Sequence, residues 1–133
     1  MKRVLIPIDW SENAERAFDW YIYQLHKKGT QIILMHFIEA TKQKEIEQKE
    51  VKMLELQEVY ETRLLQLKID HQWVTGVGTN PGEHIVRVSL EHDVDMIVMG
   101  ARGLGKLKRT ILGSVSDHVL SKTKVPVLIC KVI

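Results

Sequence analysis

Short apolar runs alternate along the chain with longer segments of mixed polarity. Four runs are almost continuously apolar: residues 4–8 (VLIPI), 31–37 (QIILMHF), 95–99 (DMIVM) and 125–132 (VPVLICKV). Such runs are typical of strands that are covered on both faces. Residues 73–77 (WVTGV) predict a further strand, which we expect at a sheet edge because glycine and polar residues interrupt it.

The segment after the first predicted strand has the periodicity of a helix. Apolar residues recur there at steps of three and four, the pattern of one buried helix face: Ala14, Ala17, Phe18, Tyr21, Ile22 and Leu25. Ser11 is placed to cap the start of this helix, and Gly29 predicts its end.

Two further helices are predicted in the C-terminal half. Asn80, Pro81 and Glu83 have the spacing of a capping box with proline in the first turn. We expect this helix to end near His92. Residues 114–121 predict the last helix, directly before the final strand.

The stretch from Thr41 to Lys68 contains neither glycine nor proline. It holds six basic and six acidic residues, so its net charge is close to zero and many i,i+4 pairs are available. Apolar residues also recur at seven-residue intervals, with two leucines beside them: Ile46, Met53, Tyr60 and Leu67, with Leu54 and Leu64. We predict one helix lying on the sheet; a helix that pairs with a partner in a coiled coil is the alternative.

Strands therefore alternate with helices along the whole sequence. This order predicts a parallel sheet with helices on both faces, an α/β fold. In such sheets, ligands bind beyond the carboxyl ends of the strands, at the point where the winding direction reverses. Asp9 and a glycine-rich loop both follow carboxyl ends of predicted strands.

Composition narrows the class of protein. A chain of 133 residues with 44% hydrophobic and 27% charged residues fits one globular domain, over residues 1–133. The net charge of +2 is too small to indicate nucleic-acid binding, and no run approaches the roughly 18 apolar residues of a membrane span. No segment has the features of a signal peptide, so we expect a soluble cytoplasmic protein without a nucleic-acid or membrane partner.

The single cysteine and the scattered aromatic and histidine residues point to no further chemistry. Cys130 is expected to be a buried, inert thiol. The three tryptophans are expected to pack within the fold rather than to form a stacking surface for nucleic acid. The six histidines show no metal-ligand spacing, and no nucleophile elbow is present.

The loop after the fourth predicted strand carries the candidate chemistry. Its glycines and the following serine have the spacing Gly100-x2-Gly103-x9-Gly113-Ser114. Glycine lets backbone amides approach anionic oxygens, and the first turn of a helix adds amides and a partial positive charge. Arg102, Lys106, Lys108 and Arg109 bring four positive charges into eight positions. The pattern indicates a phosphate site, although it lacks a Walker-type ending; a surface loop that is merely rich in glycine is the alternative.

Asp9 ends the first predicted strand, and the sequence leaves two roles open for it. Its carboxylate can accept hydrogen bonds from ribose hydroxyls or help to hold a divalent metal on a bound nucleotide. Its structural alternative is to cap the following helix together with Ser11. Pro7 restricts the chain beside it, and Phe37 can present backbone groups to an adenine edge.

The chain resembles the small single-domain type of universal stress protein, over nearly its whole length. The resemblance is carried by residues 4–11 (VLIPIDWS), 95–100 (DMIVMG), the G-x2-G-x9-GS loop, 113–116 (GSVS) and 125–128 (VPVL). It implies a five-stranded, doubly wound sheet in the order 3-2-1-4-5, like that of the adenine nucleotide alpha hydrolases. It also implies homodimerisation through the last strand, from Val125 to Ile133, and binding of ATP.

The resemblance also implies which residues contact the nucleotide. The adenine and ribose would be held by Pro7, Ile8, Asp9 and Phe37. The phosphate side would be held by Met99, Gly100, Ala101, Arg102, Gly103, Leu104, Gly105, Lys106, Gly113, Ser114, Val115 and Ser116. Ala101 departs from the family, which usually has a serine at this position, so a hydroxyl near the phosphates is missing.

The expected function is that of a regulatory protein in the stress response. We expect it to bind ATP, or AMP or ADP, with Mg²⁺ or Mn²⁺, and to hydrolyse ATP slowly at most. Two alternatives remain open: an interaction module that keeps the fold without using the nucleotide, and an enzyme whose centre would be Asp9 with a bound metal.

Overall fold

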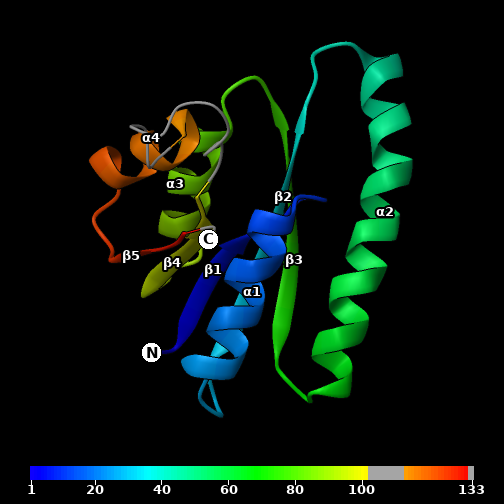
Figure 1. The fold of residues 1–133 in the computed structure, drawn as a ribbon. Coiled ribbons are helices and arrows are strands. Elements are labelled where there is room, and N and C mark those ends of the chain that lie inside the picture. Colours follow the sequence, from blue (N-terminus) through cyan, green and yellow to red (C-terminus); the bar gives the residue numbers. More distant parts are fainter. Residues whose placement is uncertain (102–112, 132–133) are drawn as a thin grey trace.

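The computed structural model describes residues 1–101 and 113–131. Strands and helices alternate through this part of the chain (Figure 1). The strands are β1 (Arg3–Pro7), β2 (Gln31–Glu39), β3 (His71–Gly78), β4 (Met96–Gly100) and β5 (Val127–Cys130). The helices are α1 (Glu12–Gln24), α2 (Gln43–Gln66), α3 (Pro81–Glu91) and α4 (Ser114–Lys122).

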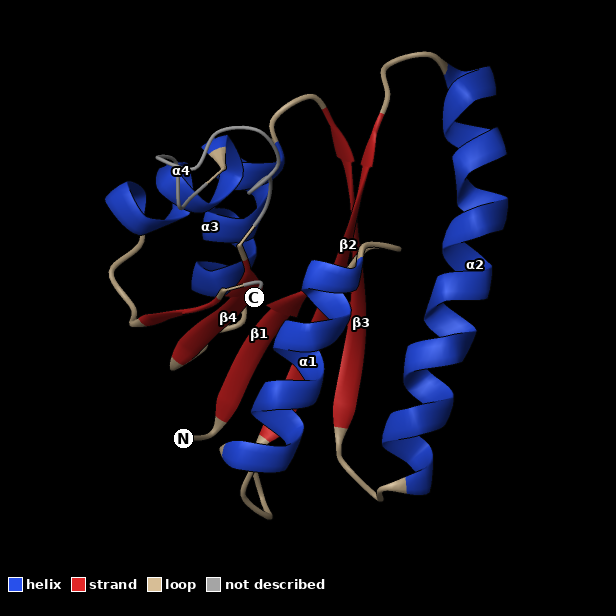
Figure 2. Cartoon of the chain, viewed as in Figure 1, coloured by secondary structure: helices blue, strands red, loops and turns tan. Residues whose placement is uncertain are grey.

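The strands form one parallel sheet with the order β3-β2-β1-β4-β5, and helices cover both of its faces (Figure 2). α1 and α2 pack on one face, while α3 and α4 pack on the other. The predicted α/β class and the doubly wound order are confirmed. β3 lies at one edge, as expected, and β5 lies at the other.

Alternate residues of the central strands divide the interior into two cores. Val4 and Ile6 of β1 point toward α1 and α2, whereas Leu5 between them points toward α3 and α4. All three side chains are fully buried. Because successive strand residues face opposite sides, an almost uninterrupted apolar run is needed to fill both cores.

The caps of α1 and α3 follow the sequence prediction. The Ser11 hydroxyl accepts a hydrogen bond from the Ala14 amide at 3.2 Å, and the Asn80 side chain accepts one from the Glu83 amide at 3.2 Å. The predicted end of the first helix is wrong: α1 ends at Gln24, and Gly29 lies in the following loop with a φ of +96°. Glycine suits that left-handed conformation.

α2 buries a different stripe from the seven-residue series in the sequence. Its buried side chains are Leu56, Tyr60 and Leu64, at steps of four. Leu54 and Leu67 are exposed, so the predicted series is wrong at these positions. A straight helix has 3.6 residues per turn, so a seven-residue series drifts around it by about 20° per heptad and only part of the series faces the sheet.

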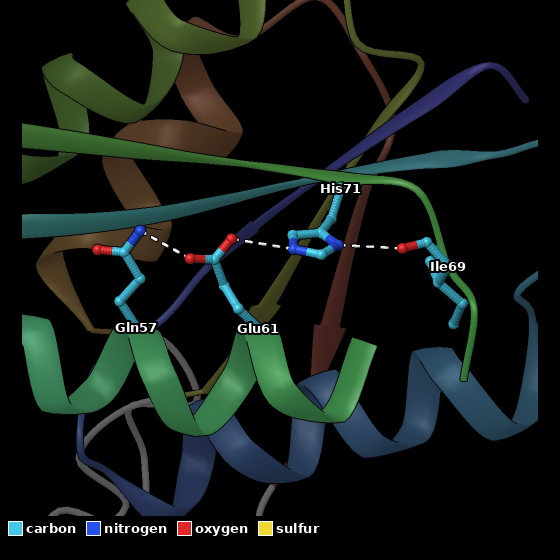
Figure 3. Close-up of polar contacts among 4 residues, drawn as sticks. All are labelled: Gln57, Glu61, Ile69 and His71. Carbon is cyan, nitrogen blue, oxygen red and sulfur yellow. Dashed lines mark hydrogen bonds and ion pairs between the residues drawn. The ribbon is translucent and has the colours of Figure 1, made fainter. Parts of the chain in front are cut away.

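Two polar clusters attach α2 to its neighbours. Arg63 pairs with Asp19 of α1 and lies 4.8 Å from the ring centroid of Phe18. At the start of β3, His71 bonds through Nε2 to Glu61 at 2.9 Å and through Nδ1 to the Ile69 carbonyl at 3.0 Å (Figure 3). The ring of His71 therefore links α2 to the residues that lead into β3.

Other boundaries and two packing expectations need correction. β5 is shorter than the predicted strand because it begins at Val127, and residues 132–133 lie outside the described part. Trp10 and Trp20 are 56% and 44% exposed, so neither is a core residue; Trp73 does pack against the core.

No helix among the described residues is long and apolar enough to cross a membrane.

Candidate functional site

A cleft opens at the carboxyl ends of β1 and β4, where the winding of the sheet reverses. Its cavity volume is about 130 Å³. An apolar cavity of about 150 Å³ accommodates a benzene-sized ring, so the enclosed part of this cleft suits one flat ring system and its continuation is open to solvent. This is the position at which ligands bind to doubly wound sheets.

The β1 side of the cleft carries a carboxylate that is already part of a turn. Asp9 Oδ1 accepts a hydrogen bond from the Ser11 amide at 2.8 Å, and Ser11 in turn caps α1. Asp9 therefore supports the cap of α1 indirectly, because it holds the residue that caps the helix, Ser11. Asp9 also lines the cleft beside Pro7 and Ile8, so the turn fixes the carboxylate at the cleft wall.

The wall formed by β2 and α3 is largely apolar. Met35 and Phe37 reach it from β2, and Pro81 and Ile85 reach it from the first turns of α3. Phe37 and His84 are in ring contact, with centroids 4.8 Å apart and planes inclined by 51°. A flat apolar ligand group fits this side better than a charged one.

Gly100 ends β4 where the backbone of α1 comes close to the sheet. A Cβ at Gly100 would overlap the backbone carbonyl of Asn13. The absence of a side chain is thus required by packing, whatever binds in the cleft. The next residue, Ala101, is fully buried and donates its amide to the Cys130 carbonyl at 2.8 Å, so this amide belongs to the sheet.

The N-terminus of α4 faces the cleft from the opposite side. Gly113 is the N-cap and offers no side chain to the first amides of the helix. Val115 and Ser116, in the first turn, line the cleft. First-turn amides and the helix dipole together favour an anionic group, which gives this side the chemistry opposite to that of the Phe37 wall.

Two histidines lie at or beside the cleft, His36 of β2 and His84 of α3. His36 lines it, and its Nδ1 lies 2.8 Å from the Ile8 carbonyl, so this nitrogen is the donor. Burial lowers the pKa of His84, and the neighbouring Arg87 lowers it further. Within residues 1–101 and 113–131, no three His, Cys, Asp or Glu side chains gather into a metal site.

Half of the residues proposed from the sequence meet in this cleft. They are Pro7, Ile8, Asp9, Phe37, Met99, Gly100, Val115 and Ser116. Ala101, Gly113 and Ser114 adjoin the cleft in sequence without lining it. Arg102, Gly103, Leu104, Gly105 and Lys106 lie outside the described residues.

Several lining residues escaped the sequence analysis. They are Ser11, Asn13, Ala14, Met35, His36, Glu39, Pro81 and Ile85. Pro81 and Ile85 carried only a helix signal, and their place in the cleft depends on how α3 crosses the end of β2. One signal was available for His36, which precedes Phe37 at the end of a predicted strand and so lies near the expected ligand edge.

Comparison with known proteins agrees with this architecture. The model of the universal stress protein family matches residues 1–131. The universal stress protein MJ0577 of Methanocaldococcus jannaschii is 29% identical over 159 aligned residues, which cover 98% of this chain and 94% of that protein. Its solved structure superposes with a TM-score of 0.81, at 31% identity and over 99% and 96% of the two chains.

Two more distant structures share the fold and contain ligands. A universal stress protein family protein of Arabidopsis thaliana, solved with AMP bound, has a TM-score of 0.78 at 19% identity and covers 98% of this chain and 92% of its own. A universal stress protein in complex with cAMP has a TM-score of 0.76 at 21% identity, with coverages of 98% and 96%. Together with the match over residues 1–131, these findings confirm the predicted family: the chain belongs to the universal stress protein family.

Proposed function

We propose that this chain is an adenine-nucleotide-binding regulatory protein of the cytoplasmic stress response. The observation that carries the proposal is the composition of the cleft. An apolar wall, a turn-fixed carboxylate and a helix N-terminus lie around one opening at the switch point of the sheet. These are three different chemistries, and a nucleotide presents a matching group to each of them.

In the proposed complex, each part of the nucleotide meets one wall. The base lies against Met35, Phe37 and Ile85, where apolar contact favours a flat ring. The ribose hydroxyls donate to Asp9. The phosphates approach the first turn of α4, and we propose that the glycine-rich loop, with Arg102, Gly103, Leu104, Gly105 and Lys106, completes their site. AMP and cAMP in the two distant structures support an adenine nucleotide of this kind.

The proposal names ATP, or AMP or ADP, as the ligand, with hydrolysis of ATP slow at most. Mg²⁺ or Mn²⁺ would be held chiefly by the phosphate oxygens, with Asp9 as the protein group nearest to them. The charge that the metal supplies would offset repulsion between the phosphates and the carboxylate. On this view the protein responds to nucleotide level rather than consuming the nucleotide.

Titration of ATP into the protein, followed by calorimetry in the presence of Mg²⁺, tests the proposal. Gly113→Val should weaken binding at least about tenfold, because the branched side chain stands where a phosphate must approach the α4 amides. The φ of Gly113 is −76°, which valine adopts freely, so strain does not explain a loss. The matched control is Leu120→Val in the same helix. Leu120 is 40% exposed and does not line the cleft, so this variant should bind ATP as the wild type does.

The absence of heat at millimolar ATP would contradict nucleotide binding. That result would favour the alternative function, an interaction module that keeps the fold without using the nucleotide. One feature of the surface supports this alternative. Val51, Leu54 and Leu65 of α2 are apolar side chains that are 62%, 59% and 68% exposed. Exposed apolar side chains that form a patch can mark an interaction surface. Release of adenine nucleotide from freshly purified, denatured protein would argue for the nucleotide-binding function instead.

We also propose that two copies associate through β5. This strand ends the sheet, and its edge has no strand neighbour among the described residues. An apolar strand with a free edge favours pairing with another chain. A homodimer would cover it.

A further inference from the structure

The ring of Phe37 is in contact with a residue that does not line the cleft. Phe37 lines the cleft, whereas His84 of α3, which contacts the Phe37 ring, is not among the lining residues. The two ring centroids lie 4.8 Å apart and the planes are inclined by 51°. A tilted contact of this kind restricts how far the Phe37 ring can turn.

Glycines in β3 make room for this pair of rings. Gly76 stands opposite Phe37 in the register between β2 and β3. A Cβ at Gly76 would lie 3.0 Å from Phe37 Cδ2 and 3.2 Å from His84 Nδ1, closer than ordinary van der Waals contact. At Gly78, a Cβ would lie 3.4 Å from His84 Nε2. Both rings therefore rest against bare backbone, and the Phe37 ring cannot retreat into β3.

Arg87 fixes the orientation of the histidine. Its guanidinium nitrogen Nη2 lies 2.6 Å from His84 Nδ1 and 3.3 Å from Nε2. A guanidinium can only donate, so the histidine faces Arg87 as a hydrogen-bond acceptor. The lowered pKa of His84 is consistent with a neutral ring. Arg87 is held in turn by Glu91, with Nε and Oε1 separated by 3.7 Å.

We propose that His84 is a positioning residue for the base subsite, which holds the Phe37 ring as the wall against which the nucleotide base lies. The inference rests on the proposed function, because it assumes that a base occupies this part of the cleft. His84 makes no contact with the ligand itself. It acts by limiting the orientations of Phe37 before the ligand arrives, so less freedom is lost on binding.

The test compares three single substitutions by the dissociation constant for ATP with Mg²⁺. His84→Leu keeps the volume and the helix but removes the flat ring. His84→Phe keeps a flat ring and removes the polar nitrogens. His92→Leu is the matched control, because His92 caps the far end of α3.

We expect His84→Leu to weaken ATP binding roughly 3- to 10-fold, the range that an aromatic pair contributes. His84→Phe and His92→Leu should both remain within about twofold of the wild type. A purely structural role would be met equally well by leucine and phenylalanine, so the difference between the two variants is the informative measurement.

Three results would overturn the inference. If His84→Leu binds ATP as the wild type does, or if the leucine and phenylalanine variants lose affinity equally, His84 does not position the base while nucleotide binding itself stands. If the wild type fails to bind ATP, the proposed function fails first. The wild-type titration therefore separates the two failures.

Discussion

Gly100 lies at the end of β4, where the backbone of α1 comes so close that no side chain fits. The Asn13 carbonyl that a Cβ would meet belongs to the first turn of a helix whose position is fixed by Ser11 and Asp9. A backbone carbonyl cannot move out of the way by changing rotamer, as a side chain can. At this residue the requirements of the fold and of the cleft coincide.

We therefore expect Gly100→Ala to lower the free energy of unfolding by about 1–3 kcal/mol, the usual cost of overpacking. Gly82→Ala is the comparison, since the atoms nearest to a Cβ at Gly82 belong to the His118 side chain, which can shift. Urea denaturation of both variants measures the difference. Equal stability of Gly100→Ala and wild type would show that α1 can move away from β4.

At the scale of elements, β5 is the least protected part of the sheet. The carbonyls of Pro126 and Cys130 accept hydrogen bonds from Ile97 and Ala101, on the β4 side. Since backbone groups alternate along a strand, those of Val127 and Ile129 point toward the free edge. These outward groups are the ones that a second copy would pair with.

Val127→Pro should weaken the proposed dimer at least about tenfold, because proline removes an outward N–H without breaking the bonds to β4. Val127→Ala is the matched control, since it shortens the side chain and keeps the donor. Sedimentation velocity at micromolar concentrations measures both variants. A wild-type protein that sediments as a monomer over this range would rule out association through β5.

At the scale of the whole molecule, one carboxylate adds to the pairing of β1 with β4 in joining the start of the chain to its second half. Asp95 Oδ2 accepts hydrogen bonds from the amides of Arg3 at 3.1 Å and Lys2 at 2.6 Å. These two bonds hold the pKa of Asp95 below its ordinary value of 3.8. The contact fixes the start of β1 against the residue that leads into β4, at the end of these strands opposite the cleft.

The lowered pKa predicts how stability depends on pH. The unfolded chain binds the Asp95 proton at a higher pH than the folded one, so the contribution is fully present above pH 3.8 and is lost as the pH falls further. Asp95→Asn should therefore be less stable than wild type at pH 6, with the difference shrinking toward pH 3. Asp93→Asn is the control, and an unchanged difference across this range would contradict the assignment.

The local patterns predicted most of the fold because each reports a physical requirement of its own segment. Continuous apolar runs predicted strands that are covered by helices on both faces. Ser11 and Asn80 predicted the helix caps that are observed. The failures came where local signals compete. Glycine at position 29 suggested a helix end, although the helix stops at Gln24. In α2, the residues singled out with the seven-residue series include the buried Tyr60 and Leu64, but also Leu54 and Leu67, which are exposed.

The sequence by itself determined the class of fold, the family and the edge of the sheet at which the cleft opens. These depend on the order of elements and on motifs at strand ends, which are continuous in the chain. Only the tertiary structure decided that Met35, Pro81 and Ile85 join Phe37 in one wall, and that His84 contacts the Phe37 ring. Such neighbours come from different elements, and their contact depends on helix packing and strand register, which no local pattern encodes.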